Sequence, residues 1–282
     1  MQIIRLAKSE FAFAAHYYIV RTFDLSINTV TQMHTTWRYL PGVLVLACAL
    51  IMLIHGAIPQ YEHYHAFVDT TSYGHIPNAM DVLSNLTFAL TGLVGMLASY
   101  WHFIRRGHQW QPTDIAYLMF VLCILATSFG SAFYHWAPDD NRLFWDRLPI
   151  ALACASLMIA VRSESRQICS SYLVVRDLMV YLSFATASVF WWQKTGDLRP
   201  YLALQLLAVV LIPIWQTIYK VAARTRWIYA IAIGLYVLAK ITEMYDEAIF
   251  MQTGFISGHT IKHLCASGAA AVIIGSWLKR AK

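Results

Sequence analysis

Charged residues are scarce in this 282-residue sequence: Asp, Glu, Lys and Arg make up 13%, whereas 59% of the residues are hydrophobic. Soluble globular domains carry about a quarter charged residues, so this shortage argues against an ordinary soluble fold. Several apolar runs approach the length of about 20 residues that a helix needs to cross a bilayer. The composition therefore predicts a polytopic membrane protein.

Paired cysteines and alternating strands are also missing. The five cysteines form no CxxC pair and lie in or beside apolar runs, so neither a disulfide framework nor a thiolate metal site is expected. The dyad pattern of a membrane β-barrel is absent, which leaves helices as the spans because helices satisfy their own backbone groups in lipid. The net charge of +6 comes from Lys and Arg that cluster in short loops, where they set the membrane topology. It is therefore not interpreted as a nucleic-acid-binding signal, and no nucleic-acid partner is expected.

The predicted fold class is all-α, with eight membrane-spanning helices. The expected spans cover about residues 42–57, 79–102, 114–136, 143–161, 173–192, 200–219, 227–249 and 258–278. Residues 1–40 are an N-terminal arm, interpreted as partly disordered or as an amphipathic surface helix. Residues 41–75 hold the extra first helix and an outer loop, and residues 76–282 form a seven-helix core.

Positive charge favours alternate loops. With a cytoplasmic N-terminus, the inside loops hold most of the Lys and Arg residues: Arg105, Arg106, Arg162, Arg166, Lys220, Arg224, Arg226 and the C-terminal cluster. The outside loops hold little beyond Arg142, Lys194 and Arg199. This bias predicts that both termini are cytoplasmic. On the same map, polar residues from several distant spans fall at one depth near the outer face.

Two histidines at helical spacing open the last span. His259 and His263 are four residues apart, so both rings project from one face of a helix. His135, at the end of the third span, falls at the same depth and can supply a third nitrogen. Three protein ligands plus water is the open arrangement of a catalytic zinc site. The sequence therefore predicts zinc held by these three histidines.

A serine and an aspartate accompany this set. Asp146 follows His135 by eleven residues, across a turn, and is predicted to act as the general base that takes a proton from water. Ser131, one turn before His135, is predicted to hydrogen-bond the oxyanion. Both residues have simpler alternatives: Asp146 could pair with Arg142 or Arg147, and Ser131 could bond to a carbonyl of its own helix.

Other residues at the same depth are candidate supporting groups. Asp81, Ser84 and Asn85 open the second span, where they could cap the helix or bond to a neighbouring helix. Glu243 and Asp246, near the end of the seventh span, could orient the histidines, and Glu243 could instead pair with Lys240. The aromatic residues Trp191, Trp192, Tyr201 and Trp227 are interpreted mainly as a belt at the membrane interface.

This ordered set of motifs resembles the alkaline ceramidase family of the CREST superfamily of membrane hydrolases. The resemblance rests on Ser131-x3-His135, on Asp146, on the Asp81–Asn85 segment and on the Ser257–Leu264 segment, and it covers about residues 76–278. It implies a seven-helix core with zinc on His135, His259 and His263, and it matches Ser131 and Asp146 to the catalytic serine and aspartate of the family. The first span and the 58–77 segment look like the added front end of bacterial-type members.

The family cleaves the amide bond of ceramide, so the resemblance implies a membrane lipid as the substrate. Animal members also carry a calcium site built from acidic residues just before the first core helix. Asp69 and Asp81 are present here, but Asn78 stands near where an acid is expected, so calcium is doubtful. Two other functions stay open: a zinc-containing receptor like the adiponectin and progestin receptors, and an ester-cleaving enzyme of lipid remodelling.

Overall fold

The computed structural model describes residues 37–280 of the chain. The chain divides into two compact units, Met1–Ala47 and Cys48–Lys282. Most of the predicted N-terminal arm, residues 1–36, lies outside the described residues. In the first unit the described part is residues 37–47, which contain the start of helix α2 (Leu40–His55). The rest of the fold belongs to the second unit.

Seven long apolar segments of the second unit could cross a membrane. The first is formed by α3 (Ala79–Leu83) and α4 (Leu86–Arg105), and the others are single helices: α5 (Asp114–Trp136), α6 (Asp140–Ser165), α7 (Ser171–Thr195), α8 (Arg199–Ile218), α9 (Ala223–Met244) and α11 (Gly258–Arg280). Among residues 37–280 every named element is a helix, and the only β pairing is two isolated bridges. The prediction of an all-helical polytopic membrane protein is confirmed at this level.

The structure does not show the predicted first span, about residues 42–57, as a helix long enough to cross a membrane. Helix α2 has 16 residues, fewer than the roughly 20 that a straight helix needs to cross the hydrocarbon core. It is apolar along its whole length, and Cys48 is its one buried residue. An extra N-terminal span therefore stays a prediction.

Two predicted spans differ from the observed helices. The expected seventh span, 227–249, ends at Met244, and a separate eight-residue helix, α10 (Asp246–Thr253), follows it. The break frees the Asp246 side chain to accept the backbone N–H of His259 at 2.7 Å. The second span is interrupted between α3 and α4, where the side chains of Ser84 and Asn85 bond to the carbonyl of Asp81.

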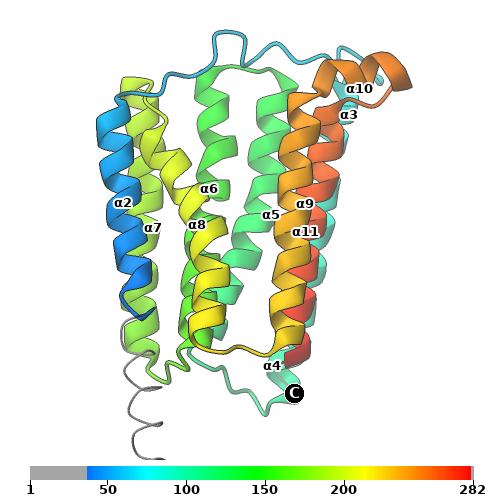
Figure 1. Cartoon of the computed structure of the whole chain (residues 1–282). Coiled ribbons are helices and arrows are strands. Elements are labelled where there is room, and N and C mark those ends of the chain that lie inside the picture. The colour runs from blue at the N-terminus through cyan, green and yellow to red at the C-terminus, as the bar shows by residue number, and fades with distance from the viewer. Residues whose placement is uncertain (1–36, 281–282) are drawn as a thin grey trace, which may run out of the picture. The chain divides into compact units, whose positions relative to one another are not determined.

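Helix α6 packs against α5, α7 and α8, and α11 packs against α9 and α4 (Figure 1). The contact between α5 and α6 is close because Gly130 has no side chain: a Cβ there would collide with the carbonyl of Trp145. Close backbone approach at small residues is the usual way in which membrane helices pack, since lipid provides little hydrophobic drive between them.

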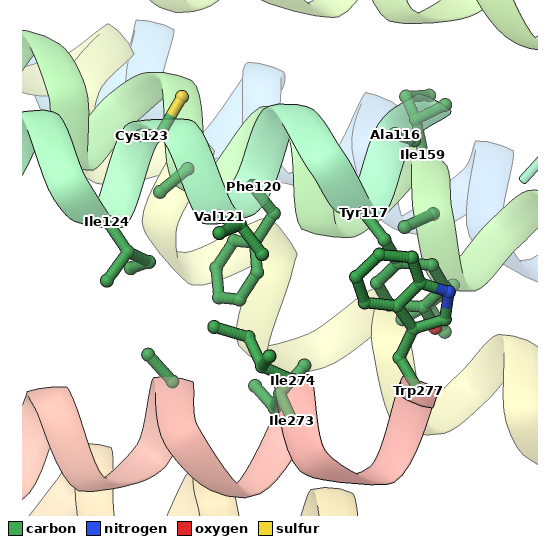
Figure 2. Close-up of a cluster of buried hydrophobic side chains, with 14 of the residues drawn as sticks. Ala116, Tyr117, Phe120, Val121, Cys123, Ile124, Ile159, Ile273, Ile274 and Trp277 are labelled. Carbon is green, nitrogen blue, oxygen red and sulfur yellow. The ribbon is translucent and has the colours of Figure 1, made fainter. Parts of the chain in front are cut away.

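The core contact between α5 and α11 lies toward the helix ends remote from the histidines. Figure 2 shows Phe120 and Val121 of α5 facing Ile273 and Ile274 of α11, with Tyr117 beside Trp277. The rings of Tyr117 and Trp277 stack with centroids 5.0 Å apart, and the Trp277 indole donates to Asp114 at 2.9 Å. This packing fixes α11 against α5 and so sets the height of the histidines relative to one another.

Candidate metal centre and cavity

The structure brings His135, His259 and His263 together. One ligand nitrogen from each of the three buried rings lies within 4.8 Å of the others. The closest pair is His135 Nε2 and His259 Nε2, at 3.1 Å. The ring centroids lie 4.6 to 5.1 Å apart. Three buried histidines are therefore close enough to hold a metal ion, although 124 residues separate His135 from His259.

The orientation of His263 is fixed by Ser84. The Ser84 hydroxyl lies 2.7 Å from His263 Nδ1 and donates to the Asp81 carbonyl at 3.0 Å. A hydroxyl has one hydrogen, so Ser84 accepts from Nδ1–H of His263 when its own hydrogen goes to Asp81. This tautomer leaves Nε2 of His263 as a lone-pair donor toward the other two rings.

The other two histidines are held through their backbones. Asp246 accepts the N–H of His259, which is one of the unpaired donors in the first turn of α11. The side-chain amide of Asn78 donates to the carbonyl of His135 at 2.8 Å, at the end of α5. Neither contact touches a ring, and both fix the position of a ring-bearing helix end.

Ser131 and Asp146 face each other beside the histidines. The Ser131 hydroxyl is a hydrogen-bonding neighbour of the Asp146 carboxylate, and both side chains line the cavity described below. Ser131 is buried and Asp146 half-buried. Within residues 37–280 no ion pair joins Asp146 to Arg142, which pairs with Asp139, or to Arg147. Ser128, rather than Ser131, bonds to a carbonyl of its own helix.

Asp81 and Asn85 lie behind the centre. Asp81 Oδ1 accepts from the hydroxyls of Ser257 at 2.8 Å and Thr260 at 2.7 Å, which ties α3 to the start of α11. Asp81 Oδ2 and Asn85 Oδ1 are buried without a hydrogen-bond partner. Asp81 thus supports the helix that carries His259 and His263.

Glu243 holds a lysine against the centre. Lys262 Nζ lies 2.6 Å from Glu243 Oε1 and 3.2 Å from His259 Nε2, while Lys240 pairs with the other oxygen of Glu243 at 2.9 Å. The predicted Lys240–Glu243 pair is therefore present. Lys262, between the two histidines in sequence, was not singled out from the sequence, although its place in the HxxxH motif is the signal that could have identified it.

The segment between α2 and α3 covers the centre. The Phe67 ring lies against His135 and His259, with centroids 4.6 and 4.8 Å away. His65 anchors the segment by bonding to Tyr134 at 3.0 Å and to Asp140 at 3.2 Å. Asp69 accepts the first N–H groups of α3, from Met80 and Asp81. The sequence predicted an outer loop here and did not reveal that it covers the histidines.

A cavity of about 360 Å³ extends from the centre into the helical bundle. At one end it is lined by polar side chains, among them Ser131, Asp146, Arg147, Glu243, Lys262 and His263. Toward the other end the lining is apolar, with Phe120, Ile124, Ile212, Tyr229, Ala270 and Ile273.

The cavity reaches the outer surface of the bundle between α8 and α9. Leu202 of α8 and Lys240 of α9 line it and are both exposed. Gln205 and Tyr236 cross this gap with a hydrogen bond of 2.9 Å. An amphiphile in the membrane could therefore reach the polar end sideways, with its chain along the apolar lining.

The predicted interface belt is wrong for two of its four aromatic residues. Trp191 and Trp227 are exposed, as expected of a belt. Trp192 and Tyr201 are buried instead, and their rings surround the guanidinium of Arg147. The sequence did not reveal this cluster, because its members come from different helices and spacing does not connect them.

Comparison with known proteins identified no relative of this chain. No protein-family model matches the chain, and neither a curated protein nor a solved structure matches it. The functional argument therefore rests on the site itself.

Proposed function

We propose that this protein is a zinc-dependent membrane hydrolase that cleaves the amide bond of a ceramide-like N-acyl lipid. The observation that supports it best is the cavity that Ser131, Asp146 and His263 line together at one end of an apolar lining, with His135 and His259 close to His263. The resemblance to the alkaline ceramidase family, carried by the same residues, points to the same reaction. The proposal places the site near the outer face, with both termini in the cytoplasm.

The donor set fits a zinc ion. Imidazole nitrogens suit zinc among the common metals, and three protein ligands leave a position open for reaction. Ser84 holds His263 in the tautomer that points a lone pair inward. His135 Nε2 and His259 Nε2 lie 3.1 Å apart, so both nitrogens are within reach of one ion. When bound, zinc supplies Lewis acidity, which lowers the pKa of water and polarises a carbonyl.

The residues of this chain then divide the remaining work. Asp146 takes a proton from the attacking water as the new C–O bond forms at the acyl carbon. The C–N bond breaks, and Asp146 returns the proton to the amine nitrogen, so the products are a fatty acid and an amine. Ser131, one helical turn before His135, donates a hydrogen bond to the oxyanion while the acyl carbon is tetrahedral.

Hydrolysis of a fluorescent ceramide by the purified full chain tests this proposal. We expect about one zinc per chain, product formation that stops on chelation, and recovery on adding zinc back. The variant Asp146→Asn is expected to retain zinc and lose about 10²-fold or more in turnover, the usual contribution of a general base. The variant His259→Ala is expected to lose both zinc and activity, whereas His75→Ala, at an exposed loop position, serves as the control.

Three results would contradict the proposal. Full activity in chelated protein or in Asp146→Asn would remove the assigned chemistry. Zinc binding with ligand-dependent conformational change but negligible turnover would favour a receptor instead. Faster cleavage of a matched ester lipid than of the amide would assign the protein to lipid remodelling, with the same residues in the same roles.

A further inference from the structure

Arg147 is a buried cation that forms no ion pair among the described residues, although its charge interacts with that of the adjacent Asp146. The residue is 3% exposed, and its Nε and Nη1 atoms are buried without a hydrogen-bond partner. Within residues 37–280 no carboxylate lies within ion-pair distance of its guanidinium. An unpaired charge removed from water is costly, so a protein that retains one usually has a partner for it at some stage of its function.

Three aromatic rings surround this guanidinium and form what we call the Arg147 cage. Arg147 Cζ lies 4.0 Å from the ring centroid of Trp192, 5.0 Å from that of Tyr64 and 5.5 Å from that of Tyr201. Cation–π contacts of this kind stabilise the charge through the electron-rich faces of the rings. A ring face accepts no conventional hydrogen bond, so Nε and Nη1 of the guanidinium stay without an acceptor inside the cage.

The cage belongs to the polar end of the cavity. Arg147, Tyr64 and Tyr201 line it together with Ser131, Asp146 and His263. Among the lining residues three cations, Arg147, Lys240 and Lys262, stand against two carboxylates, Asp146 and Glu243. Both lysines already pair with Glu243. The polar end therefore carries an excess of positive charge, and Arg147 is its unpaired member.

We propose that Arg147 binds an anionic oxygen group, a carboxylate or a phosphate, on the polar part of the lipid substrate. The inference rests on the proposed function in naming that lipid a substrate, and within the N-acyl lipids it favours anionic members over neutral ones. A planar guanidinium can hold such a group through two parallel hydrogen bonds. A neutral head group would leave these donors buried and unpaired, which disfavours its binding.

Two matched pairs of probes test the charge preference. N-dodecanoylglycine is compared with its neutral carboxamide, and N-dodecanoyl-O-phosphoethanolamine with neutral N-dodecanoylethanolamine. Binding to the zinc-loaded full chain in a neutral detergent is measured with ketone isosteres, in which a methylene replaces the amide nitrogen and prevents turnover. We expect the anionic member to bind at least about tenfold more tightly, and the two pairs show whether carboxylate or phosphate is favoured.

Variants of Arg147 connect the preference to the cage. Arg147→Gln should abolish the difference within each pair by weakening the binding of the anionic member, and Arg147→Lys should retain part of the difference. Arg176→Gln, an exposed arginine of α7 that pairs with Asp177, is the control and should change neither affinity. Equal loss of affinity for both members in Arg147→Gln would mean that Arg147 only supports packing, and would overturn the proposal.

The wild-type protein alone also decides the matter if a variant does not fold. Equal affinity for charged and neutral members would overturn the inference, whatever the variants do. Cleavage of neutral amides without charge preference would overturn this inference and leave the proposed function standing. Charge-selective binding of the isosteres without hydrolysis of the amides would support this inference and contradict the proposed function.

Discussion

Ser84 decides which nitrogen of His263 faces the candidate metal centre. Its hydroxyl lies between Nδ1 of His263 and the carbonyl of Asp81, and its one hydrogen can be donated to only one of them. A histidine that lost this contact could rotate or change tautomer, and its other nitrogen would then be a poorer ligand. Contacts behind a ligating histidine commonly change metal affinity by about 10–100-fold.

We therefore expect Ser84→Ala to weaken zinc binding by about 10–100-fold without unfolding the protein. Competition with a chromophoric chelator measures the affinity. Ser99→Ala is the matched control. Ser99 lies on α4 and is buried, as Ser84 is, but its hydroxyl bonds to the carbonyl of Gly95 in its own helix. Equal zinc affinity in Ser84→Ala and the wild type would show that Ser84 does not orient His263.

At this scale the sequence predicted the centre better than its surroundings. The four-residue spacing of His259 and His263, and the place of His135 at the end of an apolar run, were enough to bring three histidines to one depth. The sequence did not identify Lys262 and Arg147 as part of the site, because a cation beside an apolar span is usually interpreted as a signal of membrane topology. Their neighbours are set by tertiary packing, which sequence spacing does not reveal.

At the scale of elements, the junction between α7 and α8 depends on one carboxylate. Asp197 accepts hydrogen bonds from the Arg199 guanidinium at 2.9 Å, the Trp191 indole at 3.1 Å and the backbone N–H of Ile58 at 3.1 Å. The Arg199 side chain, assisted by these N–H groups, holds the pKa of the Asp197 carboxyl well below its usual range. The junction is thereby tied to the segment that follows α2.

This contact gives stability a defined pH dependence. A carboxyl whose pKa is lower in the folded state stabilises the fold above its unfolded pKa of about 3.9, and this contribution is lost as the pH falls through the folded value. Asp197→Asn should therefore lower the melting temperature in detergent at pH 7 and flatten the loss of stability below about pH 4. Thermal unfolding across pH measures both, with Glu247→Gln, an exposed site on α10, as the control.

An unchanged melting temperature in Asp197→Asn would show that the junction is held by packing alone. The sequence had placed this residue in a loop without a role. Its partners include Ile58, which is 139 residues away, so local pattern could not identify the contact. By contrast, most helix boundaries agree with the predicted spans within a few residues, since apolar length and terminal charges determine them locally.

For the molecule as a whole, the cavity is the feature that relates fold to substrate. Its apolar end is lined by aromatic, aliphatic and small residues, with Ala270 of α11 buried there beside Ile273. The depth available to an acyl chain is therefore set by side chains far from the histidines. Seven of the eight predicted spans correspond to long apolar helices, and the first span stays a prediction because α2 has 16 residues.

Filling this end should change chain-length preference. We expect Ala270→Leu to lower kcat/KM for a long-chain N-acyl substrate by about tenfold or more relative to a short-chain one, because the added carbons occupy space that the terminal methylenes need. Ala187→Leu, on an exposed position of α7, should leave the ratio unchanged. A constant ratio in Ala270→Leu would mean that the acyl chain lies elsewhere.

The Phe67 cover has a consequence for how such a protein would be assayed. This ring covers His135 and His259, and the cavity has exposed lining between α8 and α9, two helices that are apolar enough to span a membrane. Molecules that arrive by that path diffuse in two dimensions, so turnover would follow their mole fraction in the bilayer rather than their bulk concentration. Adding inert lipid at constant total substrate would then slow the reaction by surface dilution.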